Sequence, residues 1–303
     1  MNCKKMTHVI VDTDWWTDCD DVAAMRVLSW AQREGLVYVD AVTISACMEY
    51  SAPSLSAFLT AEGLGNVPLG LDHLAVNYGK IPLYQKTLAA FPNTYPTNDH
   101  CEDAVCLLRQ KLSATKEQVD IIEIGYPQVL AGLLRSTSDE INPEAGIDLV
   151  KSKVRKLWMM AGNWENENSG LENNFARNSL SRESSSYLCR NWPTPVTFLG
   201  FEVGEKILTG GNLRSEDDLL YLAMKTMGFE NGRSSWDPML MLMACIGDEK
   251  EAGYSRVCGT ASVDSTSGIN FFQPGDGLHC YVKKVHEDQF YQTMINQILA
   301  QRP

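Results

Sequence analysis

The feature that most constrains the fold is an alternation of uninterrupted apolar runs with helix-like patterns over the first two-thirds of the chain. The apolar runs have the length and β-branched content of strands, and they lie at residues 8–13, 37–45, 67–71, 119–125 and 154–162. Helix-like patterns stand between most of them, at residues 20–35, 52–65, 99–115 and 127–137. Strands that are apolar on both faces and separated by helices predict a mostly parallel sheet flanked by helices.

The chain of 303 residues is long enough to bury a substantial core. It shows no repeat, no low-complexity segment and no convincing linker, so we expect residues 1–303 to form a single, Rossmann-like α/β domain. We expect residues 72–98 to be irregular. After about residue 250, strand-like runs at 262–272 and 278–285 and a closing helix predict a small mixed C-terminal region.

Charge and cysteine content narrow the choice of partners and compartment. A net charge of −12 argues against nucleic acid or an anionic membrane surface, and no apolar stretch is long enough to cross a bilayer. Nine scattered cysteines fit reduced thiols better than a disulfide framework. The first strand begins too early for a signal peptide, although a leader removed from the natural chain stays an alternative. We therefore expect a cytoplasmic protein.

Polar residues gather just after the predicted strands. They lie at residues 12–21, 47–51, 71–73 and 125–127, and in the Asn/Glu-rich loop 163–174. The carboxyl ends of parallel strands share one edge of the sheet, and ligands of such sheets bind beyond that edge. The sequence therefore predicts that these segments form one ligand site.

Five aspartates crowd the junction between the first strand and the first helix: Asp12, Asp14, Asp18, Asp20 and Asp21. One or two acids could cap the helix and meet the positive end of its dipole, each worth under ~1 kcal/mol at an exposed site. Five exceed what capping explains, because carboxylates this close repel one another unless a cation lies among them. Carboxylate and carbonyl oxygens suit Ca²⁺ or Mg²⁺.

A strand that ends in Asp-Thr-Asp is also typical of haloacid-dehalogenase-type phosphatases, in which Asp12 would be the nucleophile. That class needs further acids and a lysine on later loops. The later Gly-Asp segments, at residues 246–251 and 274–277, lack the second acid at short spacing. A phosphatase is therefore the weaker alternative.

The segment VIVDTDWWTDCDD resembles the N-terminal aspartate motif of the nucleoside hydrolases of the inosine–uridine-preferring superfamily. The gap between its aspartate pairs is two residues longer than in the best-known members. Trp16 stands near the position where those members usually have a glycine. The resemblance continues in order through AVTIS, VPLGL, IEIGYPQVLAGLL, LWMMAGNW, LENNF and WDPMLML, and so covers most of the chain. Each piece is weak, and together they are specific.

The resemblance implies one Ca²⁺ at the bottom of a pocket and water attack on the anomeric carbon of a ribonucleoside. Asp14 would be the general base and a calcium ligand. The other implied ligands are the Asp21 carboxylate, the Ile124 backbone carbonyl and the Asp237 carboxylate. The chemistry is reasonable, because carboxylates favour the positive charge of an oxocarbenium-like transition state and a metal lowers the pKa of bound water.

The resemblance also implies a sugar-binding set. Asp20 would hold the 2-hydroxyl side of the ribose, and Glu172 and Asn174 would bind the rest of the sugar. Asn166 would contact the 5-hydroxyl, with Asn163 and Asn168 as competing candidates. Glu172 and Asn174 could alternatively cap a loop.

Two positions depart from the family pattern. Met48 replaces an asparagine that contacts the ligand in the best-known members. Trp236 stands before Asp237, where many members have a histidine thought to protonate the leaving base. The purine-specific branch also has a tryptophan there and stacks it on the base, so Trp236 could support departure of a purine or simply pack in the core. His73, Tyr78 and the pair Trp15/Trp16 are further candidates for the base pocket.

The leading hypothesis is therefore a calcium-dependent N-ribosyl hydrolase that acts on nucleosides, with a preference for purines. We expect a homodimer or homotetramer, because this superfamily tends to form both. A nucleoside- or ribose-binding homologue that keeps the calcium ligands but catalyses little is the alternative from another class.

Overall fold

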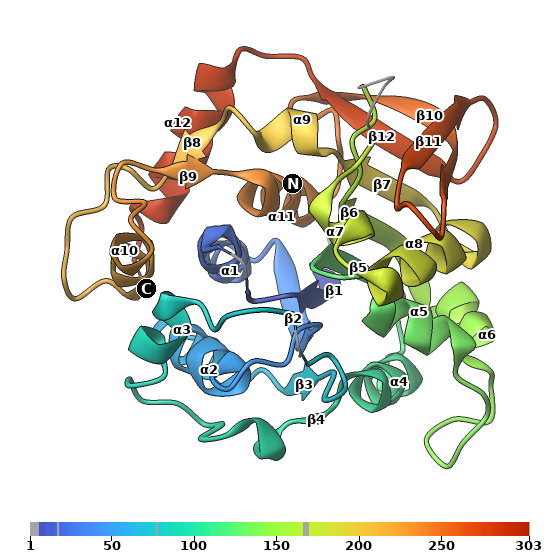
Figure 1. Cartoon of the computed structure of the whole chain (residues 1–303), viewed down its shortest axis with the longest axis horizontal. Coiled ribbons are helices and arrows are strands. Elements are labelled where there is room, and N and C mark those ends of the chain that lie inside the picture. Colours follow the sequence, from blue (N-terminus) through green and yellow to red (C-terminus); the bar gives the residue numbers. More distant parts are fainter. Residues whose placement is uncertain (1–5, 17, 77, 166–169, 303) are drawn as a thin grey trace.

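The computed structural model describes residues 6–16, 18–76, 78–165 and 170–302. In this part of the chain, ten strands form one sheet in the order β11-β10-β12-β7-β6-β5-β1-β2-β3-β4, with helices on both faces (Figure 1). The mostly parallel sheet flanked by helices that the sequence predicts is confirmed.

Eight neighbouring strands of the sheet are parallel. They are β1 (Thr7–Thr13), β2 (Val37–Ile44), β3 (Leu69–Leu71), β4 (Glu102–Asp103), β5 (Val119–Ile124), β6 (Val154–Met160), β7 (Val196–Leu199) and β12 (His279–Lys284). The antiparallel C-terminal strands β10 (Tyr254–Val263) and β11 (Asn270–Pro274) extend one edge. The short strands β8 (Leu208–Thr209) and β9 (Arg233–Ser234) pair separately.

The helices divide between the two faces, each with its own apolar core (Figure 1). One face carries α1 (Asp20–Arg33), α2 (Ser51–Ala61), α3 (Leu83–Leu88), α10 (Leu219–Thr226), α11 (Trp236–Ile246) and α12 (Asp288–Leu299). The other carries α4 (Ala104–Ala114), α5 (Gln128–Arg135), α6 (Gly146–Lys153) and α8 (Ser179–Asn191). The short helices are α7 (Asn173–Ala176), α9 (Phe201–Gly204) and the 3-10 turn Asn98–His100.

Two expectations about local structure need correction. The segment 72–98 is not wholly irregular, because it contains α3. The helix predicted from residue 99 begins at Ala104, because the Asp103 carboxylate accepts a hydrogen bond from the Cys106 backbone N–H and caps the helix there.

The order of the strands reverses at β1. From β1 the chain builds β2, β3 and β4 on one side, and then returns to place β5 on the other side of β1. Loops that leave the carboxyl ends of β1 and β5 therefore diverge and open a crevice between them. The aspartate cluster follows β1 directly, so the topology places it at this crevice.

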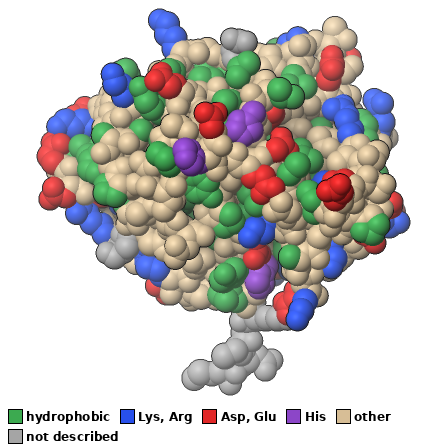
Figure 2. Space-filling view, turned by 90° about the horizontal axis from the view of Figure 1, so that it is seen from below, with side chains coloured by type: hydrophobic (Ala, Val, Ile, Leu, Met, Phe, Trp, Pro, Cys, Tyr) green, Lys and Arg blue, Asp and Glu red, His purple; other side chains and the backbone are tan. Residues whose placement is uncertain are grey.

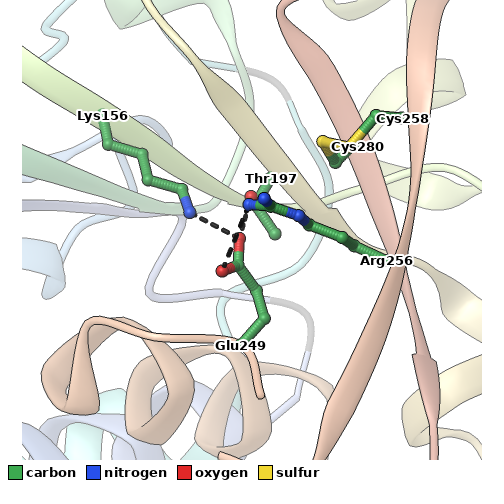
Figure 3. Close-up of a disulfide and its surroundings, with 6 residues drawn as sticks. All are labelled: Lys156, Thr197, Glu249, Arg256, Cys258 and Cys280. Atoms are coloured by element: carbon green, nitrogen blue, oxygen red, sulfur yellow. Dashed lines mark hydrogen bonds and ion pairs between the residues drawn. A yellow bond between two sulfur atoms is a disulfide. The ribbon is translucent and has the colours of Figure 1, made fainter. Parts of the chain in front are cut away.

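The C-terminal strands are fastened to the parallel sheet by a charged group and a disulfide (Figure 3). The buried Glu249 carboxylate accepts hydrogen bonds from the Lys156 ammonium of β6 at 2.5 Å and the Thr197 hydroxyl of β7 at 2.7 Å. Its other oxygen lies 3.8 Å from the Arg256 guanidinium of β10. Cys258 of β10 and Cys280 of β12 face each other across the ladder and form a disulfide. The expectation of reduced cysteines is wrong for this pair, because the strand register brings the two together. The other six described cysteines are free thiols.

The described residues include no helix long and apolar enough to cross a membrane. Figure 2 shows another side of the molecule, where acidic, basic and hydrophobic side chains are interspersed rather than gathered by kind.

A buried arginine joins three helices on the face that carries α1. The Arg26 guanidinium, 2% exposed, donates to the Glu62 carboxylate at 2.6 and 2.9 Å and to the Asp218 carboxylate at 2.9 Å. Glu62 ends α2 and Asp218 caps α10, so this network fixes α1, and with it the aspartates at its start, against its neighbours.

We predict that Arg26→Met lowers the free energy of unfolding by about 3–5 kcal/mol, because it removes the ion-pair partner of the buried Glu62 carboxylate and leaves Asp218 only the Arg302 guanidinium at 3.4 Å. Chemical denaturation measures the change. Lys225→Met, which removes an exposed ion pair with Glu216, is the control and should leave stability nearly unchanged. Equal effects of the two substitutions would contradict this account of the network.

Candidate active site

A cavity of about 220 Å³ lies at the carboxyl ends of β1, β5 and β6. Its described lining comes from distant parts of the sequence: Asp14, Trp16, Asp18, Asp20, Asp21, Ile124, Met160, Glu172, Asn173, Asn174, Phe201, Arg233, Trp236 and Asp237. The structure therefore brings together most of the site residues that the sequence predicts.

Two helix N-termini converge on this cavity. Asp20 and Asp21 form the first turn of α1, and Asp237 lies in the first turn of α11. The Asp237 backbone N–H donates to the Asp20 carboxylate at 3.3 Å, so the two helix starts touch. Each N-terminus carries a partial positive charge, which favours carboxylates at these positions over any other place on the helix.

The loop between β1 and α1 is held in a strained conformation. Trp15 has a φ of 46°, a value that a residue with a bulky side chain rarely adopts. Its indole is fully buried and donates to the Ser54 hydroxyl at 2.7 Å, which anchors the turn. The Trp16 backbone N–H then donates to the Asp14 carboxylate at 2.8 Å. The buried Trp15 indole thus anchors the turn from which the Trp16 N–H reaches Asp14, and Trp15 is not among the described residues that line the cavity.

Carboxylates crowd the bottom of the cavity. Oxygen atoms of Asp20, Asp21 and Asp237 lie within 4.8 Å of one another, and these side chains and Asp14 are 5% exposed or less. Burial raises the pKa of Asp14 to about 7 and raises the pKa values of the other three well above their usual range. The nearby like charges add to this increase.

This donor set fits a hard divalent cation. Three buried carboxylates and a main-chain carbonyl at the end of β5 offer oxygen ligands only, and a cation among them would relieve their repulsion. The expected ligands Asp14, Asp21, Ile124 and Asp237 all line the cavity. The tightest cluster, however, includes Asp20 rather than Asp14.

The two candidates for sugar binding both line the cavity, and Glu172 also caps α7. The Glu172 carboxylate accepts hydrogen bonds from the backbone N–H groups of Asn174 at 2.7 Å, Gly162 at 3.0 Å and Phe175 at 3.3 Å. The Asn174 amide donates to the Met160 carbonyl at 3.0 Å. Burial raises the pKa of Glu172 to about 7. Capping and cavity lining therefore coincide in Glu172, whereas the Asn174 side chain is held by β6.

Other residues predicted to belong to the site are not among the described residues that line the cavity. Met48 packs in a small cluster with Trp16, Tyr78 and Tyr126 and is not among the described lining residues. Asn163 lies against Asn270, whose amide accepts from the Asn163 N–H and donates to its carbonyl, both at 3.0 Å.

Asn166 and Asn168 lie outside the described residues. The His73 ring contacts the Cys101 carbonyl at 3.1 Å, and His73 is not among the described lining residues either.

Sequence reasoning overlooked Arg233 and Phe201. The Arg233 guanidinium donates to the Asp18 carboxylate at 2.8 Å and lies 5.1 Å from the centre of the Trp236 ring. Trp236 stacks on Phe201 with ring centres 5.2 Å apart, and its indole N–H donates to the Phe201 carbonyl at 2.7 Å. No local pattern signals these residues, because each depends on partners far away in the sequence.

Several solved structures are similar to this fold. A purine-preferring ribonucleoside hydrolase from Gardnerella vaginalis superposes with a TM-score of 0.72 at 16% identity, over 97% of this chain and 98% of that one. A plant nucleoside hydrolase gives 0.70 at 16% identity, with coverage of 97% and 98%. An inosine–uridine-preferring nucleoside hydrolase from Bacillus anthracis gives 0.67 at 12% identity, with coverage of 97% and 99%.

No protein-family model and no curated protein matches the sequence. The three structures show that the chain adopts the nucleoside hydrolase fold over nearly its whole length, which confirms the resemblance inferred from the sequence motifs.

The buried carboxylates make stability depend on pH. Their pKa values in the folded, metal-free protein lie above the unfolded value of about 3.9. Between these values the folded state binds more protons than the unfolded state, so the free energy of unfolding falls as pH rises. We predict that these carboxylates destabilise the metal-free protein progressively from about pH 4 to above pH 7.

Ca²⁺ should reverse this loss, because it replaces the protons. Its stabilising effect, measured as the shift in Tm between chelator and excess Ca²⁺, should be larger at pH 8 than at pH 5. Asp276→Asn, a change on the surface outside the cavity, is the control and should keep this difference. The same Ca²⁺-induced shift at both pH values would be inconsistent with binding by these carboxylates.

Proposed function

We propose that this protein is a calcium-dependent hydrolase that cleaves the N-glycosidic bond of ribonucleosides. The observation that carries the proposal is the group of four buried carboxylates in one cavity, Asp14, Asp20, Asp21 and Asp237, set in a nucleoside hydrolase fold. Such a wall of negative charge is unfavourable in an empty cavity and favourable around a cation and a developing oxocarbenium ion.

In this proposal Asp14, Asp21, Asp237 and the Ile124 carbonyl hold Ca²⁺. Ca²⁺, when bound, would orient the ribose diol and lower the pKa of a bound water. Asp20 binds the 2-hydroxyl side of the sugar.

The rest of the sugar belongs to Glu172 and Asn174, which line the same cavity. Asn166 for the 5-hydroxyl and Met48 near the ligand are proposed from the sequence resemblance alone.

The proposed reaction needs a general base and carboxylates that stabilise positive charge, both from the chain itself. Asp14 takes a proton from the attacking water, whose oxygen forms the new bond to the anomeric carbon. The bond between that carbon and the base nitrogen breaks, and its electron pair leaves with the base. The surrounding carboxylates stabilise the positive charge that develops on the sugar ring. The products are free ribose and a base that acquires one proton.

The structure argues against the phosphatase alternative and is compatible with the nucleoside-binding one. A phosphatase would need Asp12 as an accessible nucleophile, but Asp12 is fully buried and accepts a hydrogen bond from the Thr43 hydroxyl. A nucleoside-binding protein without catalysis shares the same cavity. Release of free ribose from a panel of nucleosides supports the hydrolase, whereas binding without ribose release would support the binding protein.

Some expectations rest on the sequence alone. These are the homodimeric or homotetrameric state, the cytoplasmic location and a role in purine salvage. The half-exposed Cys258–Cys280 disulfide argues against a strongly reducing compartment.

We predict that Asp14→Asn lowers the rate of hydrolysis at least ~10²-fold, the usual scale for loss of a general base, while the fold persists. Steady-state kinetics measures the rate. Calcium occupancy is measured alongside it, because the substitution also removes charge from a ligand. Near-normal turnover would show that another group acts as the base.

We also predict that Trp236→Ala slows hydrolysis of purine nucleosides more than that of p-nitrophenyl riboside, whose leaving group needs no proton. A purine that stacks on the indole gains a cation–π contribution of ~0.5–2 kcal/mol when protonated. Trp236→Phe keeps an aromatic face and serves as the matched control. Equal slowing of both substrate types, or a preference for uridine, would assign Trp236 to packing.

A further inference from the structure

Arg233 is the one basic side chain among the described residues that line the cavity. It belongs to β9, three residues before Trp236, and its side chain is 27% exposed. Its guanidinium lies 4.8 Å from the centre of the Phe229 ring and 5.1 Å from that of Trp236. An arginine in an otherwise acidic cavity needs an explanation, because a cation there weakens the hold on Ca²⁺.

The Asp18 carboxylate fixes the direction of this side chain but does not use all of its donors. A guanidinium has five N–H donors and no acceptor. One Nη atom donates to Asp18 at 2.8 Å, and Nε is buried without a hydrogen-bond partner in the described part of the chain. Arg233 therefore keeps donors for a ligand in the cavity.

The described lining offers few groups that could stabilise the departing base. None of the described lining residues is His, Lys, Tyr or Cys, and the Trp236 indole N–H already donates to the Phe201 carbonyl. The base takes the electron pair of the broken bond, and in a purine this charge spreads from N9 to N7 and, in a 6-oxopurine, to O6. A fixed cation that donates to these atoms binds the base more strongly as the bond breaks.

We propose that Arg233 binds the O6 and N7 edge of a 6-oxopurine base and stabilises the negative charge that it carries away. The proposal rests on the proposed function above. An arginine fork matches two adjacent acceptors, as in its bidentate contact with guanine O6 and N7. Adenine presents an amino donor beside N7, which faces a side chain that has donors only. A 6-oxopurine held in this way leaves as an anion and takes its proton from solvent water afterwards, so Arg233 loses none. Protonation before departure, which stacking on Trp236 would favour, then applies to purines that Arg233 does not bind, such as adenine.

The test compares wild type and variants on inosine, adenosine and p-nitrophenyl riboside. Arg233→Met should lower kcat/KM for inosine about 10- to 100-fold, the range expected from a bidentate base contact. It should change the other two substrates by less than about threefold. Arg233→Lys keeps the charge but not the fork, so it should retain part of the inosine rate and lose the preference for inosine over adenosine.

A matched control is Arg135→Met, which removes an arginine that lies 4.1 Å over the Tyr187 ring and is not among the described lining residues. It should leave all three rates unchanged. Uniform loss on all substrates in folded Arg233→Met would overturn the inference and give Arg233 a structural role through Asp18. If the wild type hydrolyses none of the three substrates, both this inference and the proposed function are rejected. If the variants do not fold, wild-type inhibition constants decide: hypoxanthine must bind more tightly than adenine.

Discussion

Repulsion among buried carboxylates is the constraint on which the rest of this structure depends. The reversal of strand order at β1 opens a crevice, and Asp14, Asp20, Asp21 and Asp237 converge in it with their side chains almost fully buried. No apolar core would tolerate such a group. The surrounding structure accepts it because two helix N-termini point at it, and because the Arg26 network and the buried Trp15 indole hold the elements that carry it.

The distribution of charge divides the cavity into two parts that suit different halves of a substrate. The carboxylates at the bottom favour a cation and a positively charged sugar, whereas the side formed by Phe201, Trp236 and Arg233 is aromatic and basic. Cleavage of an N-glycosidic bond separates charge in this sense, with positive charge on the sugar and negative charge on the base. The polarity of the cavity thus matches the polarity of the reaction that we propose.

Much of this architecture is readable from the sequence, for physical reasons. β5 and the carboxyl-terminal halves of β1, β2 and β6 are buried on both faces, so their apolar runs are clear, and the polar residues after them mark the site. α8 was missed because its serine-rich sequence gives a weak helical pattern, and its stability comes from packing on the sheet. The Cys258–Cys280 disulfide depends on an antiparallel register, and Arg233 on aromatic neighbours and on Asp18. The disulfide and the pairing of Arg233 with Asp18 join residues far apart in the sequence, so neither leaves a local signal.

A crystal structure of the protein soaked with Ca²⁺ and ribose tests the central claim most directly. We expect one Ca²⁺ among the Asp14, Asp21 and Asp237 carboxylates and the Ile124 carbonyl, with the 2- and 3-hydroxyl groups of ribose directed at the metal. Anomalous scattering would identify the ion. A cavity that binds ribose with no metal at these carboxylates, or a metal whose ligands exclude them, would contradict it.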